Sequence, residues 1–453
     1  MSSPPANSEN LSGDPRGERG FPSVPRTDVE ASAKRKAYAN IVLPLFITSI
    51  IAFLDRVNLS YAKLTMMADL QFSQSVVGLG AGIFFAGYVL FEIPGALIAE
   101  RYSPKWWLAR IMLSWGILSG LMAFVSTEGQ FYVVRFLLGV AEASLYPVIY
   151  ASCIPRWFSV QDRPRAIAVL LTSLQIATIV GSPLGGWLLG VPLFGLKGWQ
   201  GLFLVEALPA IVFAFIIVWW MADSPREARW LTEEERELLT ERYQAETAAA
   251  VGQKRLTVWQ TLADPEVLKL SLTYFLWITG FWGATFWIPS VLKESSGWSD
   301  LKVSWMIVPP MLASLALMVW IGHNSAKTGE KRWHGAVGLF LGAAGMLVGA
   351  VTTEPTVAYC CLCLAIVGVY APFGVWWSYP TTFLSGPAAA GAIGLINSFG
   401  NVGGFVGPYL TGYFKDLTGS YKGPWLYLGV SLATAGCLML TLPRQSPIPK
   451  LPK

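Results

Sequence analysis

Four charged residues lie inside stretches of this sequence that are otherwise apolar enough to cross a membrane. They are Asp55 and Arg56 in one stretch, and Arg135 and Glu142 in another. A charge near the centre of a bilayer costs at least about 2.5–3.5 kcal/mol, so such residues usually face a protected interior. Two acids and two bases form a balanced set. Protonating one acid would free one positive charge, which the negative group of a solute could then occupy.

Arg135, Gly139 and Glu142 follow the i, i+4, i+7 spacing of one helix face. Seven residues rise about 10 Å, too far for a direct pair, so we expect each charge to find its partner on the Asp55–Arg56 segment. Gly139 would allow that close approach. Arginine keeps its proton, so an arginine is the fixed positive charge and a carboxylate the proton carrier. The alternative is a buried ion network with a structural role only.

The composition places these residues in a membrane protein. The chain has 453 residues, of which 53% are hydrophobic and 13% are charged, whereas soluble domains carry about 25% charged residues. We predict an all-α membrane protein with twelve transmembrane helices in two six-helix bundles. The predicted spans are about 39–62, 75–99, 106–126, 130–151, 166–190, 200–221, 267–292, 304–322, 334–353, 357–384, 390–413 and 424–442.

Basic residues gather in the termini and loops on one side of these spans, as in 34–36, whereas the other side carries fewer, among them Lys63 and Lys197. The positive-inside rule therefore predicts that both termini are cytoplasmic. The predicted divisions are a disordered tail at 1–37, a first bundle at 38–221, a linker with an amphipathic helix at 222–265, a second bundle at 266–442 and a tail at 443–453.

The two halves of the chain echo each other in their glycines, prolines and basic loops. Gly181 to Gly186 resembles the stretch from Gly403 to Gly412, for example, and these echoes share an offset of roughly 225–230 residues. A duplicated bundle with a site between its halves is typical of transporters.

Further polar groups lie at membrane depth. Glu92 is an accessory candidate: it could carry a proton or hydrogen-bond a neighbouring helix. The second half lacks comparable charges and offers aromatic and polar groups instead, of which Trp376, Ser378, Asn397 and Asn401 are our candidates for binding a solute. The two histidines, His323 and His334, are predicted to serve a solvated loop. The five cysteines are predicted to pack as small apolar residues, so we expect no metal or other cofactor.

Several segments together resemble the major facilitator superfamily, specifically its anion:cation symporter family. They are 53–58 (FLDRVN), 135–143 (RFLLGVAEA), 198–206 (GWQGLFLVE), 223–228 (DSPREA) and 397–401 (NSFGN). The resemblance covers about residues 38–442. Residues 94–101 look like the cytoplasmic gate motif of the family, with Ala96 in place of its usual Gly and Glu100 in place of its usual Asp.

The resemblance implies a role for individual residues. Arg56 looks like the substrate-carboxylate residue, Asp55 and Glu142 like the proton-coupling acids, and Arg135 like their charge partner. Substrate contacts in the family match Tyr88, Gln175 and Asn397. Glu92 stands where the family often has Gln, which leaves the proton count open.

We therefore predict a secondary transporter that imports an organic carboxylate (an aromatic acid, a dicarboxylate or a sugar acid) with protons by alternating access. We expect a monomer in the bacterial inner membrane, in contact with lipid and not with nucleic acid. An anion exchanger or facilitator of the same fold is the alternative. A non-transporting sensor and a membrane enzyme are weaker alternatives, since the sequence has no extra folded domain, nucleophile–base set or phosphate loop.

Overall fold

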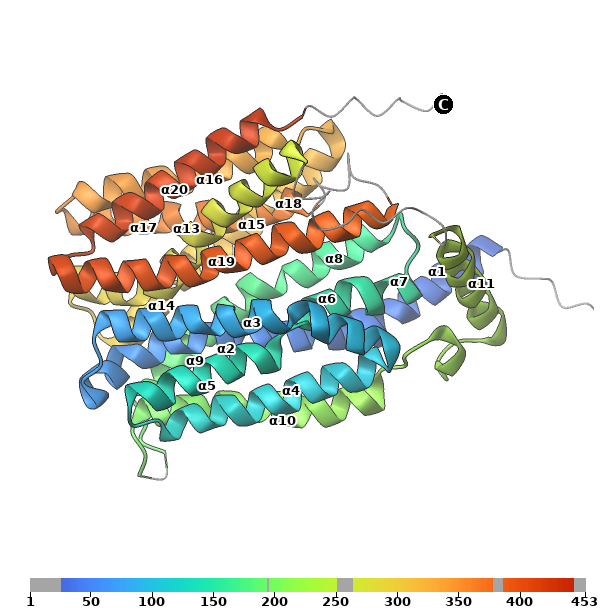
Figure 1. Ribbon diagram of the computed structural model, residues 1–453, viewed down its shortest axis with the longest axis horizontal. Coiled ribbons are helices and arrows are strands. Elements are labelled where there is room, and N and C mark those ends of the chain that lie inside the picture. The colour runs from blue at the N-terminus through green and yellow to red at the C-terminus, as the bar shows by residue number, and fades with distance from the viewer. Residues whose placement is uncertain (1–25, 194, 251–263, 378–385, 444–453) are drawn as a thin grey trace, which may run out of the picture.

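The computed structural model describes residues 26–193, 195–250, 264–377 and 386–443, and this part of the chain is helical without any strand. Eleven of its helical segments are long and apolar enough to cross a membrane. α19 (Gly386–Thr418) takes the place of the remaining predicted span. The helices form two bundles whose long axes run side by side, with the two halves of the chain in separate bundles (Figure 1).

The first bundle begins with α2, which follows a π-helical turn (Tyr38–Val42), and it contains a fourth span that is divided into several pieces. Its helices are α2 (Leu43–Leu70), α3 (Gln74–Arg101), α4 (Pro104–Leu121), α5 (Glu128–Glu142), α6 (Leu145–Pro147), α7 (Ile154–Trp157), α8 (Arg163–Leu171), α9 (Ser173–Leu189) and α10 (Gly198–Trp220). Several of these helices have a serine or threonine hydroxyl as their N-cap. The Ser73 hydroxyl, for example, accepts the backbone N–H of Val76 at 3.2 Å and so satisfies a free donor of α3.

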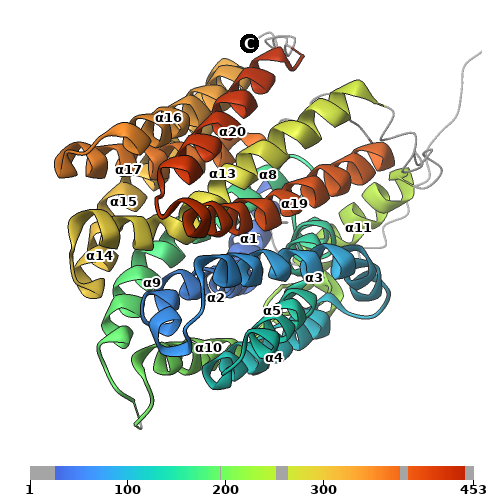
Figure 2. The same cartoon turned by 60° about the vertical axis from the view of Figure 1, so that its left-hand side comes forward.

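The second bundle repeats this plan with fewer interruptions. Its helices are α13 (Pro265–Ser296), α14 (Asp300–Met306), α15 (Val308–Thr328), α16 (Arg332–Val351), α17 (Pro355–Tyr370), α18 (Phe373–Trp376), α19 and α20 (Lys422–Thr441). Two contacts are extensive: α19 packs against α13 of its own bundle and against α3 of the other bundle. The turned view shows α19 and α3 side by side along the seam between the bundles (Figure 2).

Two helices pack together at the end of the molecule where α20 also ends (Figure 1). α1 (Arg26–Ala37) occupies a stretch for which the sequence predicted disorder, and that part of the prediction is wrong. The linker helix α11 (Glu233–Ala250) holds α1 in place, because Lys36 pairs with Glu235 at 2.7 Å. Both hydrogen bonds of the capping box between Thr232 and Glu235 are present, at 2.8 and 3.3 Å.

The bundles touch closely at the end opposite to α1. Asp416, in the last turn of α19, accepts the backbone N–H groups of Gln74 and Ser75 at 3.1 and 2.7 Å. It thereby caps α3 across the seam, where the helix dipole favours a negative charge. A Cβ added to Gly412 would lie 2.3 Å from the carbonyl oxygen of Gln74, so only glycine fits there. This end is therefore closed by backbone contact.

Replacing Gly412 with leucine is expected to hold this end open, because the new side chain would meet the backbone of α3 and not a flexible side chain. The distance between spin labels at Gln71 and Thr418, both exposed at this end, should increase. A matched control is Gly423→Leu, whose Cβ meets nothing within 4 Å. An unchanged label distance in the Gly412 variant would contradict this account of closure.

Candidate functional site

A buried ion pair between Arg56 and Glu142 is the centre of the site. Nε of Arg56, on α2, donates to Oε1 of Glu142, on α5, at 2.6 Å, and the two side chains are 10% and 0% exposed. Nη2 of Arg56 and Oε2 of Glu142 are also buried, and neither has a hydrogen-bond partner among the described residues. The Nη2 group of Arg56 and the Oε2 atom of Glu142 are therefore a donor and an acceptor that the ion pair leaves without a hydrogen bond in the described part of the chain.

The position of Glu142 depends on a break in the fourth span. α5 ends at Glu142, and Ser144 adopts a left-handed conformation with φ of 72°, which is uncommon for a residue other than glycine. The indole N–H of Trp107 donates to the Ser144 hydroxyl at 3.0 Å and so helps to hold the break. The negative end of the α5 dipole lies at Glu142, so Arg56 supplies the main compensation for an ionised carboxylate.

Asp55 and Arg135 are buried close by but are bonded differently. Asp55 accepts hydrogen bonds from the hydroxyl of Ser119 and from the Asn58 amide, the latter at 3.1 Å. Nε of Arg135 donates to the carbonyl oxygen of Gly80 at 3.1 Å. Neither Asp55 nor Arg135 belongs to an ion pair within the described residues. The expected second pair across the two segments is therefore not formed.

Both arginines lie close to the same aromatic ring. The guanidinium carbons of Arg56 and Arg135 lie 5.5 and 5.0 Å from the centre of the Phe84 ring. Arg56 also lies over the rings of Tyr88 and Tyr146, at 5.0 and 5.3 Å. Cation–π attraction strengthens where water is excluded, so these rings stabilise the arginine charge without occupying its hydrogen-bond donors.

Glu206, on α10, is a buried acid that is not among the predicted site residues. The structure places it beside the Asp55 group, where it interacts with the side chain of Asn58. Its Oε2 atom has no hydrogen-bond partner in the described part of the chain. Two carboxyl groups, Asp55 and Glu206, thus share one amide next to the arginine–glutamate pair.

A cavity of about 90 Å³ lies between the bundles, with Arg56 in its wall. Four predicted residues line it: Arg56, Tyr88, Asn397 and Asn401. The other lining residues are mostly aromatic or apolar, namely Phe53, Tyr146, Tyr150, Leu171, Leu174, Tyr274, Ile278, Phe281, Trp282, Phe373 and Trp377. Both bundles contribute, so the cavity lies on the seam.

Two tyrosines in this wall, Tyr146 and Tyr150, were missed in the sequence. They follow Glu142 at intervals of four residues, but the helix breaks after Glu142, so this spacing alone does not place them on its face.

Two predicted solute-binding residues, Gln175 and Trp376, do not line this cavity. Gln175 is buried, and its amide contacts Sδ of Met318 at 3.1 Å. Trp376 is buried against Tyr274, with ring centres 5.2 Å apart, and the adjacent Trp377 lines the cavity in its place. The prediction for Ser378 lies outside the described residues.

Glu92 joins the bundles at one edge of the cavity. Its carboxylate accepts hydrogen bonds from the amides of Asn397 and Asn401, at 2.5 and 3.4 Å. The two asparagines are one turn apart on α19, as their spacing predicted. Of the two possibilities for Glu92, the structure supports the hydrogen bond to a neighbouring helix, and this bond crosses the seam.

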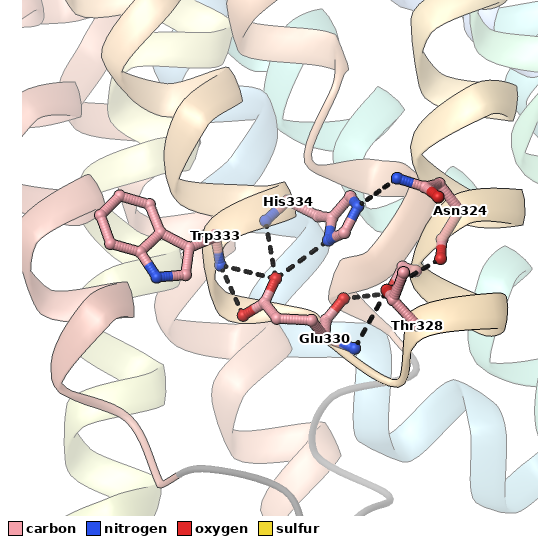
Figure 3. A network of polar contacts seen from close by, with 6 residues as sticks. Asn324, Thr328, Glu330, Trp333 and His334 are labelled. Carbon is pink, nitrogen blue, oxygen red and sulfur yellow. Dashed lines mark hydrogen bonds and ion pairs between the residues drawn. The ribbon is translucent and has the colours of Figure 1, made fainter. Parts of the chain in front are cut away.

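The histidines are remote from the cavity wall. His334 lies in the first turn of α16, where Nδ1 lies 2.9 Å from Glu330 and Nε2 lies 3.0 Å from the Asn324 amide (Figure 3). Burial raises the pKa of Glu330, but hydrogen bonds from Trp333 and His334 outweigh it and hold that pKa below its usual value. This network ties α15 to α16 and gives His334 a structural role.

Two helical bundles with a small cavity on their seam, walled from both sides and holding a buried arginine–carboxylate pair, define a two-bundle membrane transporter. The chain belongs to the Major Facilitator Superfamily, whose family model matches residues 45–408. This membership confirms the predicted fold, and it confirms that the chain is a multi-pass membrane transporter and not an enzyme.

Similar proteins agree with the anion:cation symporter branch of the family. A protein of Agrobacterium vitis named "Putative tartrate transporter" is 42% identical over 428 residues, which cover 94% of each chain. The "Inner membrane transport protein RhmT" of Escherichia coli is 33% identical and is matched over 91% of its length and 87% of this chain. The inward-open structure of the E. coli xylose transporter XylE shares the fold, with a TM-score of 0.70 at 15% identity, over 89% of this chain and 95% of that one.

Proposed function

We propose that this protein imports a small organic carboxylate together with protons, and that a dicarboxylate such as tartrate is its substrate. The observation that carries the proposal is the unused Nη2 donor of Arg56 in the wall of the central cavity. A guanidinium with a free N–H group suits a carboxylate in geometry as well as in charge. The relative named as a tartrate transporter supports the same class of substrate.

Coupling to protons follows from competition for Arg56. When Glu142 is ionised it binds Arg56 itself, at 2.6 Å, and the pair is neutral. When Glu142 is protonated its attraction for Arg56 falls, and a substrate carboxylate restores the charge balance. With Glu142 protonated, one carboxylate of the substrate balances the charge of Arg56. The second carboxylate of a dianion such as tartrate adds one negative charge, which a second proton on the buried Asp55 or Glu206 would balance, so that the loaded site again carries no net charge. A site without net charge costs less free energy to enclose in the low-dielectric interior than a charged one, so the two bundles can close around it.

Alternating access would open this site first to one side of the membrane and then to the other, as the two bundles rock around it. We infer from the basic loops that the termini are cytoplasmic, so that the end closed by Asp416 and Gly412 faces outward. In that orientation the structure represents a state closed to the outside. Separation of α3 from α19 would then admit the substrate from the outside.

The test is uptake of labelled tartrate into proteoliposomes containing the purified protein. We expect an inward proton gradient to drive accumulation above the external concentration, and a proton ionophore to abolish it. An exchanger would instead be stimulated by internal tartrate and would ignore the gradient. Absence of uptake and of binding for tartrate and for a panel of other organic acids would refute the proposal.

A further inference from the structure

Lys63 is a buried cation that the site described above does not use. The sequence assigned it to the less basic loops, but it lies inside α2 and is 1% exposed. Nζ has no hydrogen-bond partner among the described residues. Its close contacts are aromatic, since Nζ lies 3.4 Å from the centre of the Trp287 ring and 4.3 Å from that of Phe286. Within the described part of the chain, the Lys63 ammonium is therefore in contact with two aromatic rings and with no hydrogen-bond acceptor.

These aromatic contacts cross the seam between the bundles. Lys63 belongs to the first bundle, whereas Trp287 and Phe286 belong to α13 of the second. The indole N–H of Trp287 donates to the carbonyl oxygen of Pro408, on α19, at 3.0 Å, which fixes the ring to the second bundle. Any separation of the bundles at this end therefore withdraws both rings from the lysine.

Lys63 also lies in line with Arg56. The two are seven residues apart, so they share one face of α2 and lie about 10 Å apart along its axis. Phe286 connects their surroundings: its ring contacts Lys63, and the same residue lines a small void together with Arg56 and Arg135. Withdrawal of Phe286 would join the surroundings of Lys63 to those of the arginines.

A lone ammonium in this position is unfavourable in the closed state. Cation–π attraction returns only part of the hydration energy that burial removes, and no acceptor among the described residues supplies the rest. Once the rings withdraw, Lys63 becomes a hydrated cation on the wall of the opening, where its three donors are free. Its charge gains a function only in that open state.

We propose that Lys63 is a second carboxylate-binding residue, which captures the anionic substrate at the outer opening before it reaches Arg56. The inference rests on the proposed function and adds to it a site with the same ligand chemistry. When the opening closes, the rings of Trp287 and Phe286 cover the Lys63 ammonium, so the lysine releases the anion. Lys63 therefore cannot bind the anion while the opening is closed.

The test measures tartrate uptake by Lys63→Gln and by the apolar variant Lys63→Met. Both should raise KM by about tenfold and leave the maximal rate within about twofold, since a charge at an entrance acts on association. Uptake should also depend less on ionic strength. The melting temperature should stay equal or rise, because an unpaired buried charge is removed. A residue that only latched the bundles would lower stability and leave the salt dependence alone.

The matched control is Lys302→Gln. Lys302 lies over the Trp298 ring, at 4.3 Å, at the same end of the molecule but exposed, and its replacement should leave KM unchanged. Unchanged KM and salt dependence in both Lys63 variants would overturn the inference, as would a lowered melting temperature with a reduced maximal rate. If the wild-type protein neither bound nor transported any carboxylate, the proposed function would fail first. Normal wild-type uptake with unaffected Lys63 variants would refute the role of Lys63 alone.

Discussion

Replacing Arg56 with alanine is expected to weaken tartrate binding by about a hundredfold, or ~2.7 kcal/mol, because the change removes the cavity's charged donor from a desolvated site. No other cation lines this cavity within the described residues. Titration calorimetry on the purified protein measures the loss directly. Thermal stabilisation by tartrate, which reports binding to the folded state, should disappear in parallel.

Three further variants make this result specific. Arg56→Lys keeps the charge but loses the planar fork, so we expect an intermediate loss of about tenfold. Arg236→Ala removes a cation that pairs with Glu233 on the surface of α11, and it should bind tartrate normally. The double variant Arg56→Ala with Glu142→Gln avoids an unpaired buried carboxylate and serves as the folding control. Retained affinity in the folded double variant would place the anion site elsewhere.

The pairing of Arg56 with Glu142 could be predicted because helix geometry limits the choices. Arg135 and Glu142 share a helix face but lie two turns apart, which is too far for a direct pair. Each was therefore expected to pair with a charge on another helix. The second half of that prediction was wrong because Asp55 and Arg135 found neutral partners, Ser119 and the carbonyl of Gly80. Sequence spacing shows which charges cannot pair within a helix. It does not rank hydroxyl and carbonyl partners on neighbouring helices.

The sequence also could not predict which face of each helix in the second half meets the cavity. Trp376 and Trp377 are adjacent, and a step of one residue turns a side chain by about 100° around the helix axis. Where a helix is apolar on every face, no hydrophobic stripe indicates which side meets the cavity. The break after Glu142 was also missed, although Pro147 lies four residues after Ala143 and has no N–H to donate to its carbonyl. The bond from Trp107 to Ser144 adds a tertiary contact that the sequence does not show.

Glu142→Gln is expected to abolish accumulation of tartrate against its gradient while sparing exchange. Glutamine resembles the protonated acid in shape and charge, so Arg56 stays available for the substrate, but the side chain no longer exchanges a proton. In proteoliposomes with an inward proton gradient, the ratio of internal to external tartrate should fall to about one. Tartrate-for-tartrate exchange should persist, because it needs no net proton movement.

Binding separates this prediction from general damage. Wild-type affinity for tartrate should weaken as the pH rises, because ionised Glu142 competes for Arg56, whereas affinity in the glutamine variant should stay constant over the same range. Glu128→Gln makes the same substitution at the exposed first turn of α5 and should behave as the wild type. Gradient-driven accumulation that survived in Glu142→Gln would move the coupling to another acid. Asp55 and Glu206 would then be the groups to replace, because both are buried and share the Asn58 amide.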